Sequence, residues 1–447
     1  MAKSSFSHSA RKAVHQTLRK AFAFLPRNAR FAMYRSFVDC DPSPDERLVL
    51  KIADTKEELE ACFKLLHDAY VASGFMKPDP SGMRVTAYHA LPTTTTLCAK
   101  FDGQVVGTIS LIRQSPFGFP LQAVFDLSSV EEERGKIAEV SALAVHPEFR
   151  KTGGMILFPM MKFMYQYCTT FFDTRHLVIA VNPYHIELYE SLLFFQRLPQ
   201  KTVDAYDFAN GAPAVGASLD LQTAPEVLKK AYDRKDKRKN LHYYFIKLKL
   251  RNIVLPARRY FTTNDPVMTV ELLDYFFNQR TKGFEEMDEH RKALLHSIYN
   301  LPEYQPILPK LSAPLETLQT LRTVKRFSLK CRGSFKVEIE GLTQTIALQV
   351  VEISSDGFQA HSKVKLPTKV WGQLEVQLGT DEHSTVQAMV VRGKRYGDFG
   401  FYGFQLGAPD LTWRKFVSAL QSGKTHDDLA NATMFLQRDE AGELTKL

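Results

Sequence analysis

The chain has 447 residues, of which 44% are hydrophobic and 24% are charged, with a formal net charge of +9. This composition excludes a fibrous or largely disordered chain, and the length favours two or three domains over one. The five cysteines are scattered, odd in number and free of CxxC or Cys/His spacing. That pattern argues against a disulfide framework or a zinc site and favours a reducing cytoplasm.

Residues 1–47 form a basic N-terminal segment with no continuous apolar core and no small-residue cleavage site, which argues against a secretory signal. We expect it to be helical. Such a helix more often packs on its own domain, but the alternative is peripheral contact with an anionic membrane surface. No uncharged apolar run is long enough to span a bilayer, so we expect a cytoplasmic protein.

Residues 48–223 alternate short apolar strands with helical patterns, as an α/β domain does. Residues 57–74 have helical apolar spacing and end at Gly74, a plausible helix stop. Residues 96–112 predict two strands around an Asp-Gly turn. Further strands are expected at "IAEVSALAV" and "HLVIAV", each followed by a helix.

Residues 224–312 become helical and charged and end in a proline-rich linker. Most of the excess positive charge lies in residues 229–259. Its interpretations are a solvated helix face or a docking surface for an acidic partner. A nucleic acid polymer is disfavoured because no recognition helix, zinc finger or RNP pattern is present.

Residues 320–422 consist of short alternating runs separated by glycine or polar turns, which predicts a small all-β barrel. Residues 423–447 form a polar tail that we expect to be flexible.

The stretch "LAVHPEFRKTGGM", residues 143–155, places Arg150, Gly153 and Gly154 between a predicted strand and a predicted helix. Backbone N–H groups at such a helix start can hold pyrophosphate or a phosphopantetheine arm. A glycine pair alone is more often just a tight turn, so the surrounding motifs decide its meaning.

Those motifs are "GTISLIRQSPFGFPLQAVF", "AEVSALAVHPEFRKTGG", "LVIAVNPYHIELYESLLFF" and "ANGAPAVGASLDL". In this order they resemble the GNAT acyltransferase superfamily, and within it the long-chain N-acyl amino acid synthases, relatives of the acyl-homoserine-lactone synthases. The phosphate-binding signature maps onto Arg150, Gly153 and Met155, where the methionine replaces the usual glycine or alanine.

The resemblance implies an enzyme that moves a long-chain acyl group from acyl carrier protein to the amino group of an amino acid or similar amine. It implies no prosthetic group and no metal. Acyl-CoA is the alternative donor. A carrier-borne pantetheine lacks the 3′-phospho-ADP of coenzyme A and needs less phosphate cradle, which makes Met155 tolerable.

Amide formation from a thioester needs a neutral amine, a route for its proton and polarisation of the carbonyl. The resemblance makes Glu139 the acceptor of the amine proton and Tyr189 the acid for the departing sulfur. The alternatives are an exposed strand glutamate and a core aromatic. Ala142 and Phe194 depart from the family pattern, which has arginine and glycine at these positions.

The remaining predicted roles concern substrate and donor. The donor-binding residues are expected to be Leu143, Ala144, Val145, Arg150, Gly153 and Gly154. Ser141 and Asn182 are expected to orient the substrate. His146 and His185 have no carboxylate partner or metal spacing in the sequence, so we do not expect them to act as bases.

The predicted barrel opens with "LRTVKRFSL", in which Arg322 and Arg326 have RxxxR spacing, and continues with "EISSDG". Together with "VVRGKRYGDFGFYGFQL" this resembles the PilZ domain, a bacterial sensor of cyclic di-GMP. The resemblance implies nucleotide contacts from Arg322, Arg326, Glu352, Ser354 and Gly357. Paired guanidiniums suit phosphates and guanine edges, and glycine permits close approach.

Glu352 is one methylene longer than the family's aspartate or asparagine. The alternative is a PilZ-like barrel that no longer binds nucleotide and serves as an interaction module.

The sequence therefore predicts a GNAT-like α/β acyltransferase, a helical linker region and a C-terminal PilZ-type barrel, with acyl transfer regulated by cyclic di-GMP. Three alternatives stay open. The first is an acyl-homoserine-lactone-like signal synthase that uses S-adenosylmethionine. The second is a small-acyl GNAT enzyme that uses acetyl-CoA, and the third is a non-catalytic cyclic di-GMP effector.

Overall fold

The computed structural model describes residues 25–312 and 326–422, apart from Arg134, Lys151, Asp173, Lys201, 257–259, Thr263, Pro266, Asn300, Glu340 and 397–398. The first half of the predicted N-terminal segment, the polar tail and Arg322 lie outside the described residues. Within the described part, no helix combines the length and apolar character needed to cross a membrane.

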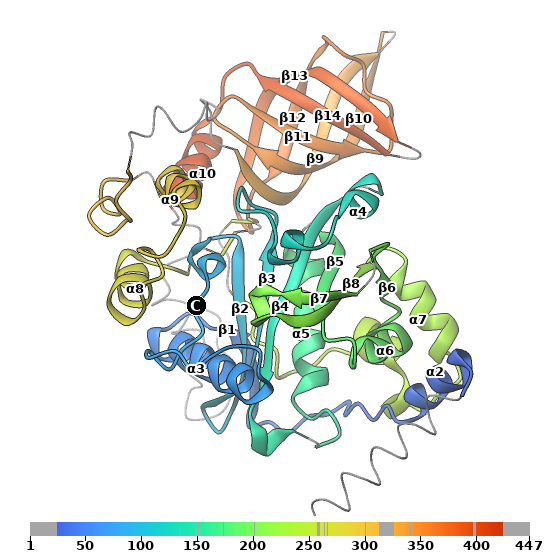
Figure 1. The fold of residues 1–447 in the computed structure, drawn as a ribbon. Helices are drawn as coiled ribbons and strands as arrows, with labels where there is room; N and C mark the ends of the chain where they lie inside the picture. Colours follow the sequence, from blue (N-terminus) through green and yellow to red (C-terminus); the bar gives the residue numbers. More distant parts are fainter. Residues whose placement is uncertain are drawn as a thin grey trace, which may run out of the picture.

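The α/β domain is built on an eight-stranded sheet in the order β1-β2-β3-β4-β5-β8-β6, with β7 paired to β8 (Figure 1). The pairing of β4 with β5 is parallel, and the others are antiparallel. The strands are β1 (Leu48–Ile52), β2 (Thr94–Phe101), β3 (Gln104–Arg113), β4 (Lys136–Val145), β5 (Thr174–Val181), β6 (Gln196–Arg197), β7 (Val203–Tyr206) and β8 (Ala212–Asp220).

Two long helices cover opposite faces of this sheet. Helix α3 (Lys56–Ser73) begins at Thr55, whose hydroxyl accepts a hydrogen bond from the Glu58 N–H, and ends at Gly74 with φ of 75°. Helix α5 (Leu157–Phe171) packs on the other face, with Phe163 and Tyr167 fully buried. The shorter helices of this part are α2 (Arg27–Ser36), α4 (Ser128–Glu132), α6 (Ile186–Leu188) and α7 (Ala224–Tyr232).

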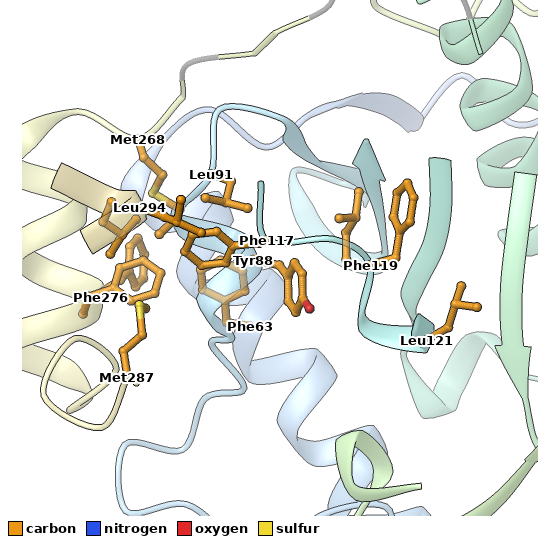
Figure 2. Packing of buried hydrophobic residues seen from close by; sticks show 14 of the residues in the cluster. Phe63, Tyr88, Leu91, Phe117, Phe119, Leu121, Met268, Phe276, Met287 and Leu294 are labelled. Atoms are coloured by element: carbon orange, nitrogen blue, oxygen red, sulfur yellow. The ribbon is translucent and has the colours of Figure 1, made fainter. Parts of the chain in front are cut away.

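Residues 264–308 share a hydrophobic core with the α/β domain rather than forming a separate layer. Figure 2 shows Met268, Phe276, Met287 and Leu294 of this segment among side chains of the α3 face. The rings of Phe63 and Phe276 meet edge to face at 5.1 Å. Full burial of such side chains stabilises a fold by roughly 1.5–3 kcal/mol each, so this segment is part of the domain's core. Its elements are α8 (Val270–Asp274), the π-helix η8 (Tyr275–Arg280) and α9 (Glu289–Ile298).

The C-terminal region is a closed barrel in the order β10-β11-β14-β13-β12-β9, lying beyond one end of the α/β sheet in Figure 1. Helix α10 (Leu411–Ser422) packs on it through Trp413, which is fully buried and donates its indole N–H to the Ser354 carbonyl at 3.0 Å. The predicted GNAT-like α/β fold and C-terminal all-β barrel are confirmed. The barrel strands are β9 (Phe327–Ile339), β10 (Leu342–Ile353), β11 (Gly357–Ser362), β12 (Trp371–Gln377), β13 (His383–Tyr396) and β14 (Phe399–Leu406).

Candidate functional site

Strands β4 and β5 pair along only the first part of β4. Their register runs from Lys136 opposite Thr174 to Glu139 opposite Val178 and goes no further. Against β3, Ala142 and Leu143 together face Ile109, so β4 carries a bulge there, and Ala142 has a left-handed φ of 56°. A bulge bends its strand and increases its twist, which explains why β4 separates from β5 beyond Glu139.

A cavity of about 350 Å³ lies where the two strands separate. Its volume is within the range of small-molecule sites, and its lining is predominantly apolar. Among the predicted site residues, Ser141, Leu143, Asn182 and Tyr189 line it. Further lining residues come from helix α5, strands β5 and β8, and the segments after β8: Met161, Met164, Tyr165, Leu177, Ile179, Leu219, Ala224, Leu228 and Phe245.

Glu139 is buried, with only 2% of its surface exposed, so the alternative of an exposed strand glutamate is wrong. Its carboxylate accepts a hydrogen bond from the Leu121 N–H at 3.0 Å, and none of the described cations pairs with it. Burial raises the pKa of Glu139 to about 8, partly offset by the Leu121 hydrogen bond. A carboxylate with a pKa near neutral pH suits general base catalysis.

Tyr70, near the C-terminal end of α3, links Glu139 to the cavity. Burial, with a smaller contribution from the Glu139 carboxylate, raises the pKa of Tyr70. The same two causes raise the pKa of Tyr206 on β7. Tyr70 also lines the cavity, so one side chain both interacts with the Glu139 carboxylate and forms part of the cavity wall. Neither tyrosine stands out in the sequence, where each has the spacing of a core residue.

Tyr189 is the first residue of the π-helix η4 (Tyr189–Leu193), and its ring meets Phe195 edge to face at 5.9 Å. Burial raises its pKa, so the phenol stays protonated and remains a proton donor. Asn182 also lines the cavity, but its Oδ1 accepts from the Tyr184 N–H at 3.0 Å. Phe194, at the family's glycine position, has a left-handed φ of 64°, the conformation that glycine would adopt without strain.

The glycine turn before α5 needs its glycines. Gly153 and Gly154 have φ of 69° and 88°, and a Cβ on Gly154 would lie 2.5 Å from the Phe158 ring. The exposed Arg150 donates from Nε to the Val145 carbonyl at 2.7 Å. Met155 packs against the apolar core of the α5 face. Core packing therefore explains a large side chain at this position, whichever acyl donor the protein uses.

The side chains of Ala144 and Val145 do not line the cavity. Ala144 packs near Leu65 and Leu66 on the α3 face, and Val145 packs on the α5 face. Any role of these two residues in donor binding therefore belongs to their backbone.

The basic region borders the cavity through helix α7. Ala224 and Leu228 line the cavity, while Lys229 and Lys230 are exposed on the same helix. Among the described cations that follow, Arg238 pairs with Asp39 at 2.7 Å. Exposed positive charge therefore lies on an element that forms the cavity wall.

The predicted nucleotide-binding residues that the structure describes lie close together on the barrel. Arg326 Nη1 lies 2.8 Å from Glu352 Oε1. Ser354 donates to Asp356 Oδ1 at 2.8 Å and accepts from the Gly357 N–H at 3.1 Å. A surface cavity of about 310 Å³ adjoins them, and its lining adds two charged residues that the motifs did not predict, Asp356 and Arg392. Arg392 lies in the quoted "VVRGKRY" stretch, but one arginine among several basic residues carries no distinct signal.

The barrel touches the α/β domain through β9. Lys330 donates from Nζ to the carbonyls of Thr169 and Phe172 at 3.1 and 3.3 Å, which caps the C-terminal end of α5. A cavity of about 430 Å³ lies nearby, lined by Lys136 of the α/β domain and by Ser328 and Glu352 of the barrel. Glu352 therefore borders both this interdomain cavity and the barrel cavity.

Comparison with known proteins supports the acyltransferase reading. Residues 61–220 match the family model of N-acyl amino acid synthase FeeM, which covers less than half of the chain. This match identifies the α/β domain as an acyltransferase domain. The search of curated proteins found no similar sequence.

The chain is also similar to solved structures. FeeM, an N-acyl amino acid synthase from uncultured soil microbes, is 24% identical, with 40% of this chain and 93% of that chain covered and a TM-score of 0.34. BjaI, a CoA-dependent acyl-homoserine lactone synthase, is 16% identical, with coverages of 46% and 93% and a TM-score of 0.33. An N-acetyltransferase from Staphylococcus aureus is 19% identical, with coverages of 39% and 98% and a TM-score of 0.29.

Proposed function

We propose that this protein transfers a long-chain acyl group from acyl carrier protein to the amino group of an amino acid or similar amine. The observation that carries the proposal is a buried carboxylate, Glu139, on strand β4, whose next residues, Val140 and Ser141, line the apolar cavity that opens where β4 leaves β5. The carboxylate supplies a base whose pKa suits neutral pH, and the cavity supplies space for an apolar chain.

In the proposed reaction, the amine nitrogen attacks the thioester carbonyl carbon and forms the C–N bond. Glu139 takes the proton that the nitrogen loses, and the C–S bond breaks. Tyr189, a protonated phenol on the cavity wall, donates a proton to the departing thiolate. In this proposal a backbone N–H at the Ala142–Leu143 bulge polarises the carbonyl.

Acyl carrier protein is the proposed donor because exposed lysines accompany the apolar wall of the cavity on α7. Opposite charge speeds the encounter of acidic and basic partners. Met155 packs in the core and so does not decide between carrier and coenzyme A. An acetyl group would leave most of a cavity of about 350 Å³ unfilled, which disfavours the acetyl-CoA alternative.

The C-terminal barrel is proposed to be a PilZ domain that binds cyclic di-GMP and regulates the transfer. Arg326, Glu352, Ser354 and Gly357 lie together at one surface cavity, which supports this assignment. Regulation requires that the nucleotide bind two states of the enzyme differently. The cap that Lys330 forms on α5 is a direct physical connection, because α5 also forms a wall of the acyl cavity.

Incubation with palmitoyl acyl carrier protein and pooled amino acids, followed by mass spectrometry, tests the proposed activity. N-palmitoyl amino acids are the expected products. Lactones formed from S-adenosylmethionine would indicate the signal synthase instead, and faster turnover of acetyl-CoA would indicate the small-acyl enzyme. Tight binding of cyclic di-GMP by calorimetry without any acyl transfer would identify the non-catalytic effector.

A further inference from the structure

Arg84 occupies a fixed position in the loop between α3 and β2. Its guanidinium carbon lies 4.4 Å from the centre of the Tyr70 ring and 4.8 Å from that of Phe208. Nη2 donates to the Phe208 carbonyl at 2.7 Å, and the backbone N–H donates to the Phe63 carbonyl at 3.0 Å. Two rings and one hydrogen bond therefore hold the guanidinium in place, and the backbone hydrogen bond holds the loop that carries it.

Among the residues that the structure describes, no carboxylate forms an ion pair with Arg84. Arg84 is partly buried, and this burial lowers its pKa, with Tyr70 and Tyr206 opposing the shift. A guanidinium removed from water is costly unless an anion and hydrogen-bond acceptors meet it. A positioned arginine without a protein anion is suited to an anion supplied by a ligand.

The surroundings of Arg84 connect it to Glu139. Tyr70 and Tyr206 each interact electrostatically with both Arg84 and the Glu139 carboxylate. The Tyr206 hydroxyl is buried, and no described residue gives it a hydrogen-bond partner. Two tyrosines therefore lie near both charges, and one of them has an unused donor.

The turn that carries Phe208 is held against the end of α3. Asn210 donates from its side-chain amide to the Gly74 carbonyl at 3.2 Å, and the Gly211 N–H donates to the Tyr206 carbonyl at 3.0 Å. The aromatic surroundings of Arg84 are thus built by contacts between segments far apart in the sequence.

We infer that Arg84 binds the carboxylate of the acceptor amino acid, with the Tyr206 hydroxyl as a second donor, and so directs the amino group toward Glu139. This assignment rests on the proposed function. Guanidinium and carboxylate match in shape and charge and can form paired hydrogen bonds. Arg84 then makes a free α-carboxylate the feature that separates a good acceptor from a simple amine.

The donor phosphate is a weaker occupant for Arg84. Met83, the residue before it, belongs to the core on the α3 face of the sheet, whereas the glycine turn leads into α5 on the opposite face. The sheet therefore lies between Arg84, the proposed site of the acceptor carboxylate, and the glycine turn, the proposed site of the donor phosphate.

The test compares phenylalanine with 2-phenylethylamine, which lacks the carboxylate, at a fixed concentration of palmitoyl acyl carrier protein. For Arg84→Gln we expect kcat/KM to fall about 100-fold with phenylalanine and less than about threefold with the amine. Arg84→Lys should recover part of the loss because it restores charge without the planar fork. Arg47→Gln is the matched control, because Arg47 also stacks on an aromatic ring, Phe101 at 4.4 Å, but lies exposed on another surface.

Equal losses of kcat/KM with both acceptors would assign Arg84 a structural role and overturn the inference. A ratio of kcat/KM for phenylalanine to that for 2-phenylethylamine that is the same in Arg84→Gln and the wild type would overturn it too. Thermal unfolding with phenylalanine gives a second readout that does not depend on turnover. Phenylalanine should raise the Tm of the wild type and of Arg47→Gln but not of Arg84→Gln, and equal shifts in all three would also overturn the inference. Absence of acyl transfer to pooled amino acids by the wild type would contradict the proposed function, and the Tm comparison would still decide the role of Arg84.

Discussion

Glu139 and Glu352 both lie on strands where motifs predict a functional carboxylate, and their surroundings differ in kind. Glu139 is 2% exposed and receives one backbone hydrogen bond, whereas the Glu352 side chain is 22% exposed and lies 2.8 Å from Arg326. Burial raises the pKa of Glu139 to about 8. The first environment suits proton transfer near neutral pH, and the second suits the exchange of one ionic partner for another when a charged ligand arrives.

The largest effect is expected at the buried carboxylate. Glu139→Gln keeps the shape and the Leu121 hydrogen bond but removes the base, so acyl transfer should fall about 10²–10⁴-fold at pH 9. Turnover with palmitoyl acyl carrier protein measures this. Glu338→Gln, an exposed glutamate on strand β9, is the control and should leave turnover unchanged. Equal turnover in Glu139→Gln and wild type would remove Glu139 from the mechanism.

A smaller but still large effect is expected in the barrel. Arg326→Ala removes a cation from the proposed nucleotide surface and leaves Glu352 unpaired, so the affinity for cyclic di-GMP should fall at least about 30-fold. Calorimetry measures it. Lys336→Ala is a suitable control, because Lys336 lies on β9, the strand that follows Arg326, but pairs with Glu375 at 3.1 Å. Unchanged affinity in Arg326→Ala would separate the barrel from nucleotide binding.

A variant of Lys330 tests the connection between the barrel and the α/β domain. Lys330→Met keeps the unbranched apolar part of the side chain but removes the ammonium group that caps α5, so we expect cyclic di-GMP to bind with the same affinity while its effect on turnover disappears. In the wild type the nucleotide should change turnover measurably, because a coupling of the usual strength changes the affinity of one site for its ligand about 5- to 150-fold when the other is occupied. If Lys330→Met responds to the nucleotide as the wild type does, the coupling does not pass through this contact.

The difference between the two carboxylates should also appear in stability. The pKa of Glu139 is about 8 in the folded protein and near its ordinary value in the unfolded chain, so the folded state binds the extra proton in between. The free energy of unfolding should therefore decrease as pH rises from about 4.5 to about 8. Urea titrations at several pH values should show this slope in the wild type and a flatter curve in Glu139→Gln. Identical slopes would mean that Glu139 is not buried as a neutral acid.

Much of the architecture follows from local patterns. The helix stop at Gly74, the β2–β3 turn, the glycine turn before α5 and the alternating barrel strands are all encoded within short windows. The glutamate at position 139 and its strand are likewise predictable. The packing of residues 264–308 could not be predicted from the sequence. Its apolar residues form a core only together with the α3 face, as the contact between Phe63 and Phe276 shows.

The parts of the candidate site that escape prediction depend on long-range contacts. The burial of Glu139 requires the loop that carries Leu121. Arg84 gains its position from Tyr70 and Phe208, which lie on separate elements, and Lys330 meets α5 across two domains. None of these pairs has a spacing that could reveal it in the sequence. Among the non-glycine residues with left-handed φ, Ala142 and Phe194 coincide with the two departures from the family pattern.

The most direct test of the central claim is the ratio of wild-type to Glu139→Gln single-turnover rates across pH 6 to 10 at a fixed amino acid concentration. Titration of the amine affects both enzymes equally and cancels in the ratio. A base with a pKa of about 8 predicts that the ratio rises about tenfold per pH unit below that value and levels off above it. A ratio close to one throughout would contradict the assignment of Glu139 as the base.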